Sequence, residues 1–385
     1  MNFRYFCIII LMISLGFIQK INAKTAYLLN VDGIITSATS EYIRNGIGES
    51  YSKKAELLVI KLNTPGGMLE STREIVQSIL DCRIPVVVYV SPSGGRAGSA
   101  GVFITLAANI SAMAPGTNIG AAHPVGIDGS ADSSVMFTKI ENDAAAFIRT
   151  IAERRGKNAE WAEKAVRESV SITENEALEN NVIDLIEKDI YSLLKSINGR
   201  EVNTSKGKHL INTDGIVLER REMNFREKLL SFLSNPNLAY ILILIGIYGL
   251  IFEFKSPGSI YPGVIGALSL IIAAYSLQLM PVNYVGLALI LLALILFIIE
   301  IFVQSYAILT IGGVISFALG SVMLINSPYE IMEISMPLII FATILTAMFF
   351  VLIIWIGLKA QNRKKTAIAA EMKGLKGVAL DDINT

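Results

Sequence analysis

Ser99 is the side chain in this sequence best placed to act as a nucleophile. It follows a glycine-rich turn and an apolar run typical of a buried strand, residues 86–90 (VVVYV), and it precedes a small-residue helix. At such a junction a tight turn exposes the hydroxyl, and the free amides and positive dipole of the helix start stabilise negative charge beside it. Residues 97–101 (AGSAG) resemble a nucleophile elbow with alanine in place of its first glycine. The motif indicates either acyl-transfer chemistry or a purely structural turn.

A second glycine-rich turn lies where it could take part in the same chemistry. Residues 63–67 (NTPGG) follow a strand-like apolar run, 57–62 (LLVIKL), and precede an amphipathic helix that begins near Leu69. The glycines of this turn allow positive φ angles. Because turns at the carboxyl ends of parallel strands gather at one edge of a sheet, we expect the 63–67 turn and Ser99 to share one crevice.

The segment from Lys24 to about Asn235 has the pattern of the scaffold that such a crevice requires. Continuous apolar strands alternate with helical periods, which indicates a mostly parallel sheet covered on both faces. We also predict strands at 27–31, 110–113 and 182–184, a loop at 114–124, helices at 40–47, 133–155 and 159–167, and small strands and turns over 197–222. Lys139 lies at the flank of the apolar stripe of helix 133–155, so the helical period permits partial burial of this lysine without requiring it.

The composition indicates a membrane protein. Of the 385 residues, 52% are hydrophobic and 17% are charged, and the mean hydropathy is +0.54. Apolar segments follow one another after Pro236, at about 238–252, 262–279, 284–303, 307–325 and 336–358. We therefore predict a multi-pass membrane domain over residues 236–358 with about five transmembrane helices.

Charge and the N-terminal sequence predict the orientation in the cell membrane. Residues 1–23 are typical of a signal peptide cleaved after Ala23, although an uncleaved anchor is an alternative. The tail 359–385 is rich in Lys and Arg, whereas the loop 326–335 has neither, so the positive-inside rule places the C-terminus in the cytoplasm. With five crossings, the domain of residues 24–235 then lies outside the cytoplasm.

The segment that precedes the membrane domain is also amphipathic. Residues 225–233 (FREKLLSFL) combine apolar and basic side chains at helical spacing. This segment is either a helix on the membrane surface or an ordinary surface helix.

Several function classes are disfavoured. The 33 basic and 33 acidic residues cancel, and no basic run with interleaved aromatics occurs, which argues against nucleic-acid binding. Cys7 and Cys82 have no neighbour at metal-ligand spacing, so we expect no disulfide framework, no metal and no cofactor. The membrane half lacks the repeated broken-helix pattern of secondary transporters, which disfavours transport.

Four motifs in order along the chain resemble the NfeD family of membrane-bound serine proteases, a family similar to ClpP and to signal peptide peptidase A. They are NTPGG at 63–67, SGGRAGSAG at 93–101, APGTNIGAAHP at 114–124 and KIEND at 139–143. The resemblance covers nearly the whole chain, including the loop 256–266 between the first two apolar segments. It implies an α/β ClpP/crotonase-like domain followed by an all-α polytopic membrane domain.

The resemblance implies a Ser–Lys dyad in which Ser99 matches the nucleophile and Lys139 the general base. A serine hydroxyl attacks a carbonyl efficiently only when a base accepts its proton. A lysine does so as a neutral amine, which desolvation or nearby positive charge favours, and Arg96 could supply that charge. By the same matching, the amides of Gly67 and Ala100 form the oxyanion hole, where such donors contribute about 3–4 kcal/mol each.

His123 is the alternative base. It follows Ser99 by 24 residues, near where ClpP-like proteases place the histidine of a Ser–His–Asp triad. The segment 168–173 (ESVSIT) resembles the part of ClpP that supplies the aspartate, but Ser169 occupies that place and Glu168 lies one position away. A histidine without an orienting carboxylate is a poor base, so we favour Lys139.

The resemblance implies a membrane-anchored serine endopeptidase that cleaves hydrophobic segments near the bilayer through an acyl-enzyme. It suggests a stomatin- or prohibitin-like membrane protein as partner and substrate, and a homodimer of the protease domain. The alternatives are a non-catalytic membrane scaffold for stomatin-type proteins and a signal-peptide peptidase. Long family members continue into a soluble OB-type barrel, and residues 372–380 (MKGLKGVAL) resemble its start. We therefore expect the tail 359–385 to be the truncated start of an OB-like domain, or a separate protein to supply the barrel.

Overall fold

The structure is a computed structural model that describes residues 24–124, 133–255, 260–280, 282–303, 307–325, 333–352 and Trp355. The chain forms two compact units, Met1–Ser231 and Phe232–Thr385. The predicted signal peptide (1–23), the predicted basic tail (359–385) and part of the motif loop (256–259) lie outside the described residues.

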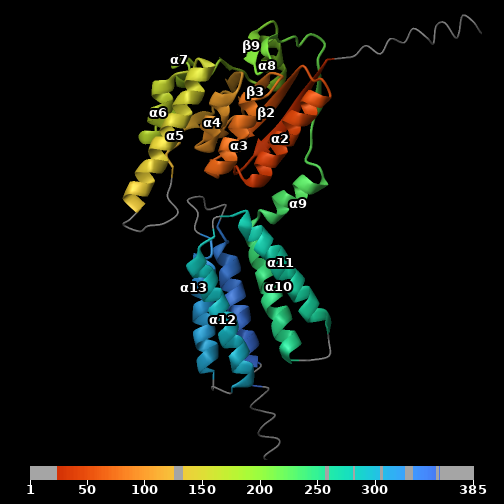
Figure 1. Cartoon of the computed structure of the whole chain (residues 1–385), viewed down its shortest axis with the longest axis vertical. Helices are drawn as coiled ribbons and strands as arrows, with labels where there is room; N and C mark the ends of the chain where they lie inside the picture. Colours follow the sequence, from red (N-terminus) through yellow and green to blue (C-terminus); the bar gives the residue numbers. More distant parts are fainter. Residues whose placement is uncertain are drawn as a thin grey trace, which may run out of the picture. The chain divides into compact units, whose positions relative to one another are not determined.

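The first unit is built on a six-stranded parallel sheet with the strand order β11-β1-β2-β3-β5-β8 (Figure 1). Its strands are β1 (Thr25–Asp32), β2 (Leu57–Asn63), β3 (Val86–Val90), β5 (Ile110–Met113), β8 (Leu185–Ile186) and β11 (Val217–Arg220). In register, Leu58 lies beside Val86, and Val87 lies beside Ile110. All residues of β3 are buried, as expected for a central strand covered on both faces.

Alternate side chains of this sheet belong to two hydrophobic cores. Leu58 and Ile60 pack in the core formed with the larger helices, and Leu57 and Val59 pack in the opposite core. The first core includes residues of α2 (Ser37–Ser52), α3 (Leu69–Leu80), α4 (Ala100–Ala107), α5 (Ser133–Arg155) and α6 (Ala159–Arg167). The second includes residues of α8 (Ile190–Ser196) and of the hairpin formed by β9 (Glu201–Thr204) and β10 (Gly207–Leu210). The predicted sheet with two covered faces is therefore confirmed.

A small second sheet joins segments that sequence analysis treated as irregular. β4 (Arg96–Gly98) pairs in parallel with β6 (Asn118–Gly120), and β6 pairs antiparallel with β7 (Ser171–Thr173). The prediction of a continuous loop at 114–124 was wrong, because strands of three residues show no hydrophobic period and depend on partners far along the chain. The strand predicted at 182–184 was also misplaced, since the Asp184 carboxylate accepts a hydrogen bond from the Ser111 amide (2.8 Å) and pairing begins only at Leu185.

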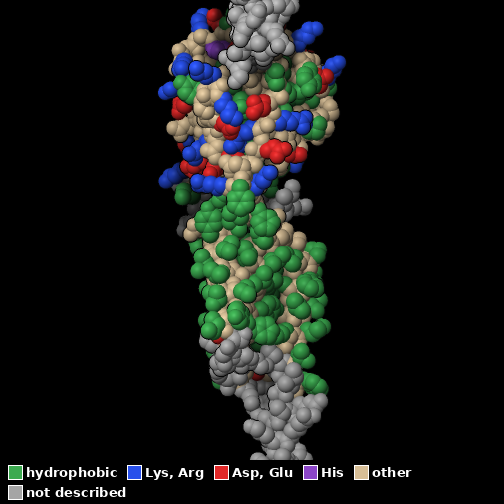
Figure 2. All heavy atoms as spheres, turned by 90° about the vertical axis from the view of Figure 1, so that its right-hand side faces the viewer, with side chains coloured by type: hydrophobic (Ala, Val, Ile, Leu, Met, Phe, Trp, Pro, Cys, Tyr) green, Lys and Arg blue, Asp and Glu red, His purple; other side chains and the backbone are tan. Residues whose placement is uncertain are grey.

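The second unit consists of apolar helices. In its described part these are α10 (Pro236–Lys255), α11 (Ile260–Gln278), α12 (Tyr284–Phe302), α13 (Ile308–Met323) and the helix Met336–Leu352. α10 and α11 contain stretches long and apolar enough to cross a membrane, and the apolar stretches of the other helices, Tyr284–Glu300, Ile308–Met323 and Met336–Leu352, are shorter. Hydrophobic side chains cover the face of this unit seen in Figure 2, whereas charged side chains are frequent on the visible face of the α/β unit. The number of crossings stays a prediction.

Glycine residues bring α10 and α11 into close contact. A Cβ atom on Gly246 would lie 2.4 Å from the Leu270 side chain, and one on Gly249 would lie 2.7 Å from the Gly266 Cα. Close backbone approach at small residues is the usual way in which helices pack in membranes. Gly246, the earlier glycine of α10, meets Leu270, whereas the later Gly249 meets Gly266, which precedes Leu270 in α11. The two helices therefore run antiparallel.

Candidate active site

Ser99 occupies the turn between β4 and α4. Its backbone has φ 47° and ψ −107°, a strained conformation for a residue with a side chain. Its amide donates a hydrogen bond to the carbonyl of Gly120 in β6 (3.0 Å), so the small second sheet holds the turn. A serine on a strained turn at the head of a helix is the geometry of a nucleophile elbow. The predicted tight turn at this serine is confirmed.

The 63–67 turn lies directly against the Ser99 turn. The Gly98 amide donates to the Thr64 carbonyl (2.9 Å), and the Thr64 amide donates to the Arg96 carbonyl (2.8 Å). A Cβ atom on Gly98 would lie 2.8 Å from the Pro65 carbonyl oxygen. The structure thus brings together the two turns that sequence analysis expected in one crevice, and small residues permit this approach.

The amides of Gly67 and Ala100 have no hydrogen-bond partner among the described residues. Ala100 is the first residue of α4, where an amide has no partner within the helix. Gly67 faces Ile35, but the bonds there are formed by its neighbours, from the Ile35 amide to the Gly66 carbonyl and from the Met68 amide to the Ile35 carbonyl (both 2.9 Å). A Cβ atom on Gly67 would lie 2.2 Å from the Ile35 carbonyl oxygen, so the position requires glycine.

Lys139 lies near the start of α5, and its side chain is exposed. Asp143, one turn further along the same face, forms an ion pair with Arg73 of α3. The Arg73 guanidinium also lies over the ring of Phe147, 4.4 Å from its centroid. Because α3 begins two residues after Gly67, the face of α5 that carries Lys139 is directed towards the helix that follows the glycine turn.

α4 and α5 run parallel to one another. The ring of Phe103 in α4 stacks on Phe147 of α5 with centroids 5.8 Å apart. Further along both helices, Arg155 Nε donates to the carbonyl of the last residue of α4 (2.8 Å). Ser99 and Lys139 both precede these contacts, so they lie at the same end of the helix pair. No hydrogen bond joins their side chains in the described structure, and such contacts commonly form only when substrate is bound.

His123 is held between α5 and α6. Its Nδ1 lies 2.7 Å from the Val166 carbonyl oxygen. Because a carbonyl can only accept a hydrogen bond, we assign the proton to Nδ1, which leaves the lone pair on Nε2. The ring also packs against Phe137 of α5, with centroids 5.4 Å apart. The imidazole is therefore oriented by a backbone carbonyl rather than by Glu168, and no hydrogen bond joins it to Ser99 among the described side chains.

The other end of α5 is anchored by an ion pair between a buried lysine and a partly exposed aspartate. Lys157, just after α5, has a side chain only 4% exposed, and its Nζ lies 2.7 Å from Asp184 Oδ1. Burial lowers the pKa of Lys157, while the attraction of Asp184 acts in the opposite direction. The C-terminal end of α5 is thus fixed to the sheet, while its Lys139 end is exposed.

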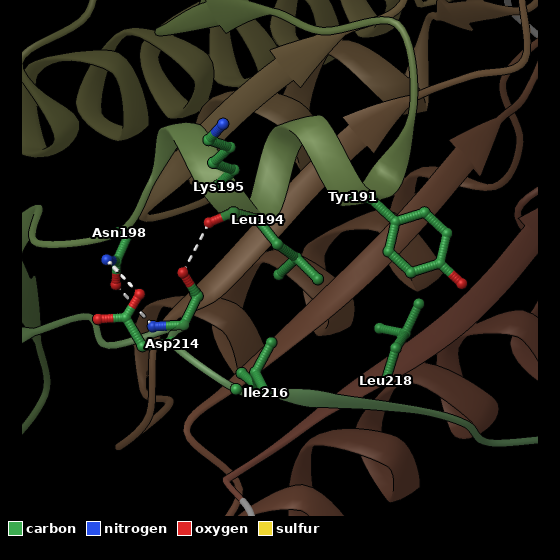
Figure 3. Close-up of a pocket in the computed structure, with 9 residues that line it drawn as sticks. Tyr191, Leu194, Lys195, Asn198, Asp214, Ile216 and Leu218 are labelled. Atoms are coloured by element: carbon green, nitrogen blue, oxygen red, sulfur yellow. Dashed lines mark hydrogen bonds between the residues drawn. The ribbon is translucent and has the colours of Figure 1, made fainter.

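A pocket lies away from these residues, between α8 and the segment 213–218 (Figure 3). The Thr213 hydroxyl donates to the Leu194 carbonyl (2.8 Å), and the Asn198 side chain donates to Asp214 (3.0 Å). The pocket contains none of the predicted site residues. Within the described ranges, no group of three or more His, Cys, Asp or Glu residues could hold a metal ion.

Sequence analysis missed Gly120 as a residue that shapes the site. Its φ is +147°, and a Cβ atom there would lie 2.3 Å from the Val170 carbonyl oxygen. Gly120 is therefore required for β6 to lie against β7 and to bind the Ser99 amide. The glycine is visible in the 114–124 motif, but its partner strand could not be identified from local sequence.

Two family models match the chain. The NfeD1b N-terminal domain matches residues 25–213, and the NfeD integral membrane domain matches residues 237–356. The chain is 33% identical over 98% of its length to the membrane-bound protease PH1510 of Pyrococcus horikoshii, and the match covers 88% of that protein. It is 27% identical over 87% of its length to the membrane protein NfeD1b of Bacillus subtilis, covering 75% of that protein.

A solved structure also resembles the α/β unit. It is a lysine-to-alanine mutant of the 1510-N membrane-bound stomatin-specific protease in complex with a substrate peptide, with a TM-score of 0.51 and 34% identity. The match covers 55% of this chain and 99% of that one. Together with the parallel sheet and the apolar helices, these relatives define the class as a membrane protease with an N-terminal α/β domain. Within that class, the chain belongs to the NfeD family, as its motifs indicated.

Proposed function

We propose that the protein is a membrane-anchored serine endopeptidase in which Ser99 is the nucleophile and Lys139 is the general base. The observation that carries the proposal is the strained Ser99 turn packed against the 63–67 turn, with two amides beside it that have no partner in the described part of the chain. Those amides, of Gly67 and Ala100, would form the oxyanion hole. The close relationship to a membrane-bound protease supports the same chemistry.

In the proposed mechanism, Ser99 Oγ attacks the carbonyl carbon of the scissile peptide while neutral Lys139 accepts the hydroxyl proton. The carbonyl oxygen becomes an oxyanion that accepts hydrogen bonds from the Gly67 and Ala100 amides. When the C–N bond breaks, the leaving amine takes the proton from Lys139, and an ester links the acyl half of the substrate to Ser99. Water then attacks this ester, and Lys139 accepts a proton from that water. The ester C–O bond breaks as Lys139 gives the proton to Ser99 Oγ, which releases the acyl half of the substrate as a carboxylic acid.

Because Lys139 is exposed, a bound substrate can cover its side chain and displace water from it. An ammonium group loses its proton more readily when water is displaced from around it, so a bound segment that covers Lys139 favours the neutral base. Apolar side chains lie close in sequence both to the glycine turn and to Lys139. Met68 follows the glycine turn, and Met136, one turn before Lys139, is 63% exposed. These residues support a hydrophobic substrate.

The solved relative is described as stomatin-specific. We therefore propose a stomatin- or prohibitin-like membrane protein as substrate and, from the family resemblance, a homodimer of the protease domain. The protease domain would comprise residues 24–235 outside the cytoplasm, followed by about five crossings within 236–358 and a cytoplasmic C-terminus. The charge of the tail 359–385 supports this orientation.

The test measures cleavage of a hydrophobic peptide from the C-terminal tail of a stomatin-like protein by the detergent-solubilised full-length chain. Ser99→Ala should abolish cleavage, and Lys139→Ala should lower kcat by about 10²–10⁴-fold. Lys139→Arg should be equally impaired because a guanidinium remains protonated and cannot act as the base. His123→Ala should retain activity, with kcat lowered by no more than about tenfold through loss of its packing against Phe137.

Lys164→Ala is the matched control, because Lys164 is an exposed lysine on neighbouring α6 that pairs with Glu160. It should cleave at the wild-type rate. An inactive His123→Ala variant together with an active Lys139→Ala variant would assign the base to His123. Absence of Ser99-dependent cleavage over a broad peptide set would favour a membrane scaffold, and cleavage of leader peptides alone would indicate a signal-peptide peptidase.

A further inference from the structure

Helix α9 (Phe225–Leu233), between β11 and the first apolar helix, carries an exposed apolar stripe. Phe225 is 83% exposed, Leu229 is 44% exposed and Phe232 is 60% exposed. Their spacing of four and three residues places them on one face of the helix. Large apolar side chains that are exposed together on one face of a short helix indicate that this face contacts an apolar environment.

The opposite face of α9 is fixed to the α/β unit. Glu227 is fully buried, and its two carboxylate oxygens accept hydrogen bonds from Arg221 at 2.9 and 2.7 Å. Asn45 of α2 donates to the same carboxylate (2.8 Å), as does the Asn224 amide (2.9 Å). Burial acts to raise the pKa of Glu227, but these hydrogen bonds outweigh it and hold the pKa below its usual range. The ionised Glu227 therefore sets the rotation of α9, and the stripe cannot turn towards the protein.

The end of α9 is bonded to the end of a membrane-type helix. The Ser276 hydroxyl, in the last turn of α11, donates to the Leu233 carbonyl. α10 begins at Pro236, three residues after α9 ends, and it runs antiparallel to α11. The last residue of α9 thus lies where α10 starts and α11 finishes. In a helical hairpin that crosses a bilayer, this end is at the interface between water and lipid.

We propose that α9 lies in the lipid interface, with Phe225, Leu229 and Phe232 inserted at the boundary between headgroups and acyl chains. Arg226 and Lys228 flank the stripe, paired with Glu41 (3.2 Å) and Glu222 (3.7 Å). Because both basic side chains are largely exposed, they can exchange these partners for lipid phosphates, as basic residues do on interfacial helices. The proposal goes beyond the proteolytic function, and it rests on the proposed crossing by α10 and α11. It assigns α9 as a lipid anchor fused to the α/β unit through the Arg221–Glu227 pair.

Spin labels on the full-length protein in phospholipid bilayers test this proposal. Single cysteines are introduced as Phe225→Cys, Leu229→Cys and Phe232→Cys in a background with Cys7→Ala and Cys82→Ala. Collision rates with oxygen, which concentrates in lipid, are compared with those of a water-soluble nickel chelate. Ser231→Cys is the matched control, because Ser231 is exposed on a different face of the same helix. Ile271→Cys, on an exposed face of α11, provides the reference for the acyl region.

We expect labels at all three stripe positions to favour oxygen over the nickel chelate, with a depth of about 5–10 Å, and the label at Ser231 to favour the chelate. Preferential collision with the chelate at the stripe would show that it faces water. Low collision with both reagents would show that protein, such as a second copy of the chain, covers it. Either result overturns the proposal, and a lipid signal at Ile271 in the same experiment leaves the crossing of α11 intact.

Discussion

The two halves of the candidate site differ in how firmly the fold holds them. Ser99 and the 63–67 turn are joined by backbone hydrogen bonds and by glycine contacts that tolerate no side chain. Lys139, in contrast, is exposed at the start of α5, whose nearest ties are the Arg73–Asp143 ion pair and the packing of Phe137 on His123.

The difference teaches that the proposed nucleophile and the proposed oxyanion-hole amides are preorganised, while the proposed base lies at a helix end with few contacts. α5 itself repeats the contrast, because its C-terminal end is fixed by Arg155 and by the Lys157–Asp184 ion pair. Preorganised donors need no reorganisation when charge develops in the transition state. We therefore expect substitutions in the first half to affect stability and activity together, and substitutions in the second half to affect activity alone.

Gly67→Ala should lower activity and stability together. The new Cβ atom would lie 2.2 Å from the Ile35 carbonyl oxygen, so the turn must move and its amide with it. Loss of one oxyanion donor lowers kcat by about 10²–10³-fold, and the overpacking should cost about 1–3 kcal/mol of stability. Peptide cleavage and thermal unfolding of the same preparation measure both effects.

Gly48→Ala is the control for this substitution. Gly48 is an exposed residue of α2, and a Cβ atom there would meet nothing within 4 Å. It should leave kcat unchanged and stabilise the helix by about 0.5–1 kcal/mol. Wild-type cleavage by Gly67→Ala would contradict the oxyanion role and the rigid first half.

Lys139→Ala should separate activity from stability. The side chain is exposed and makes no hydrogen bond among the described residues, so the free energy of unfolding should stay within about 0.5 kcal/mol of wild type. The kcat for peptide cleavage should nevertheless fall by about 10²–10⁴-fold. Unfolding by denaturant, followed by near-ultraviolet circular dichroism, provides the measurement. A destabilisation comparable to that of Gly67→Ala would show that both halves are equally built into the fold.

Phe137→Ala should have a smaller effect on the rate. The substitution removes the ring that packs on His123 and loosens the turns of α5 that carry Lys139. We expect kcat to fall by about tenfold, a cost near 1.4 kcal/mol, with the pH profile unchanged, because the base itself remains. Phe137→Leu should restore most of the rate. A loss confined to KM would indicate instead that Phe137 contacts substrate and does not position the base.

The smallest expected effect is a pH dependence at the fixed end of α5. Burial lowers the pKa of Lys157 below its unfolded value of about 10.4. Between these two values the unfolded chain binds more protons than the folded one, so this lysine makes stability rise with pH. The melting temperature of wild type, relative to that of Lys157→Met, should therefore rise as the pH increases towards about 10.

Lys164→Met is the matched control for the pH experiment, because the exposed Lys164 has its pKa raised by its hydrogen bond and attraction to Glu160. The melting temperature of wild type, relative to that of Lys164→Met, should not rise over the same pH range. If Lys157→Met behaves like Lys164→Met, burial does not lower the pKa of Lys157 in the folded protein.

Much of the α/β unit could be predicted from local sequence. The apolar runs at 57–62, 86–90 and 110–113 form central strands within a residue of their predicted bounds, and the helices at 133–155 and 159–167 match α5 and α6. Burial on both faces leaves a continuous apolar signal in such strands. β4, β6 and β7 could not be predicted, because strands of three residues carry no periodic signal and are selected by their partners.

The sequence by itself determined the candidate chemistry: the Ser99 elbow, the glycine turn at 63–67 and the apolar helices after Pro236 are all local patterns of residue type and spacing. Only the tertiary structure decided that the Gly67 amide has no partner among the described residues and that the Gly120 carbonyl accepts a hydrogen bond from the Ser99 amide. It also decided that a fully buried Glu227 orients α9. Each of these features depends on a contact between segments distant along the chain or on burial by neighbouring elements. The free energy of such contacts cannot be inferred from the residue types around any single position in the sequence.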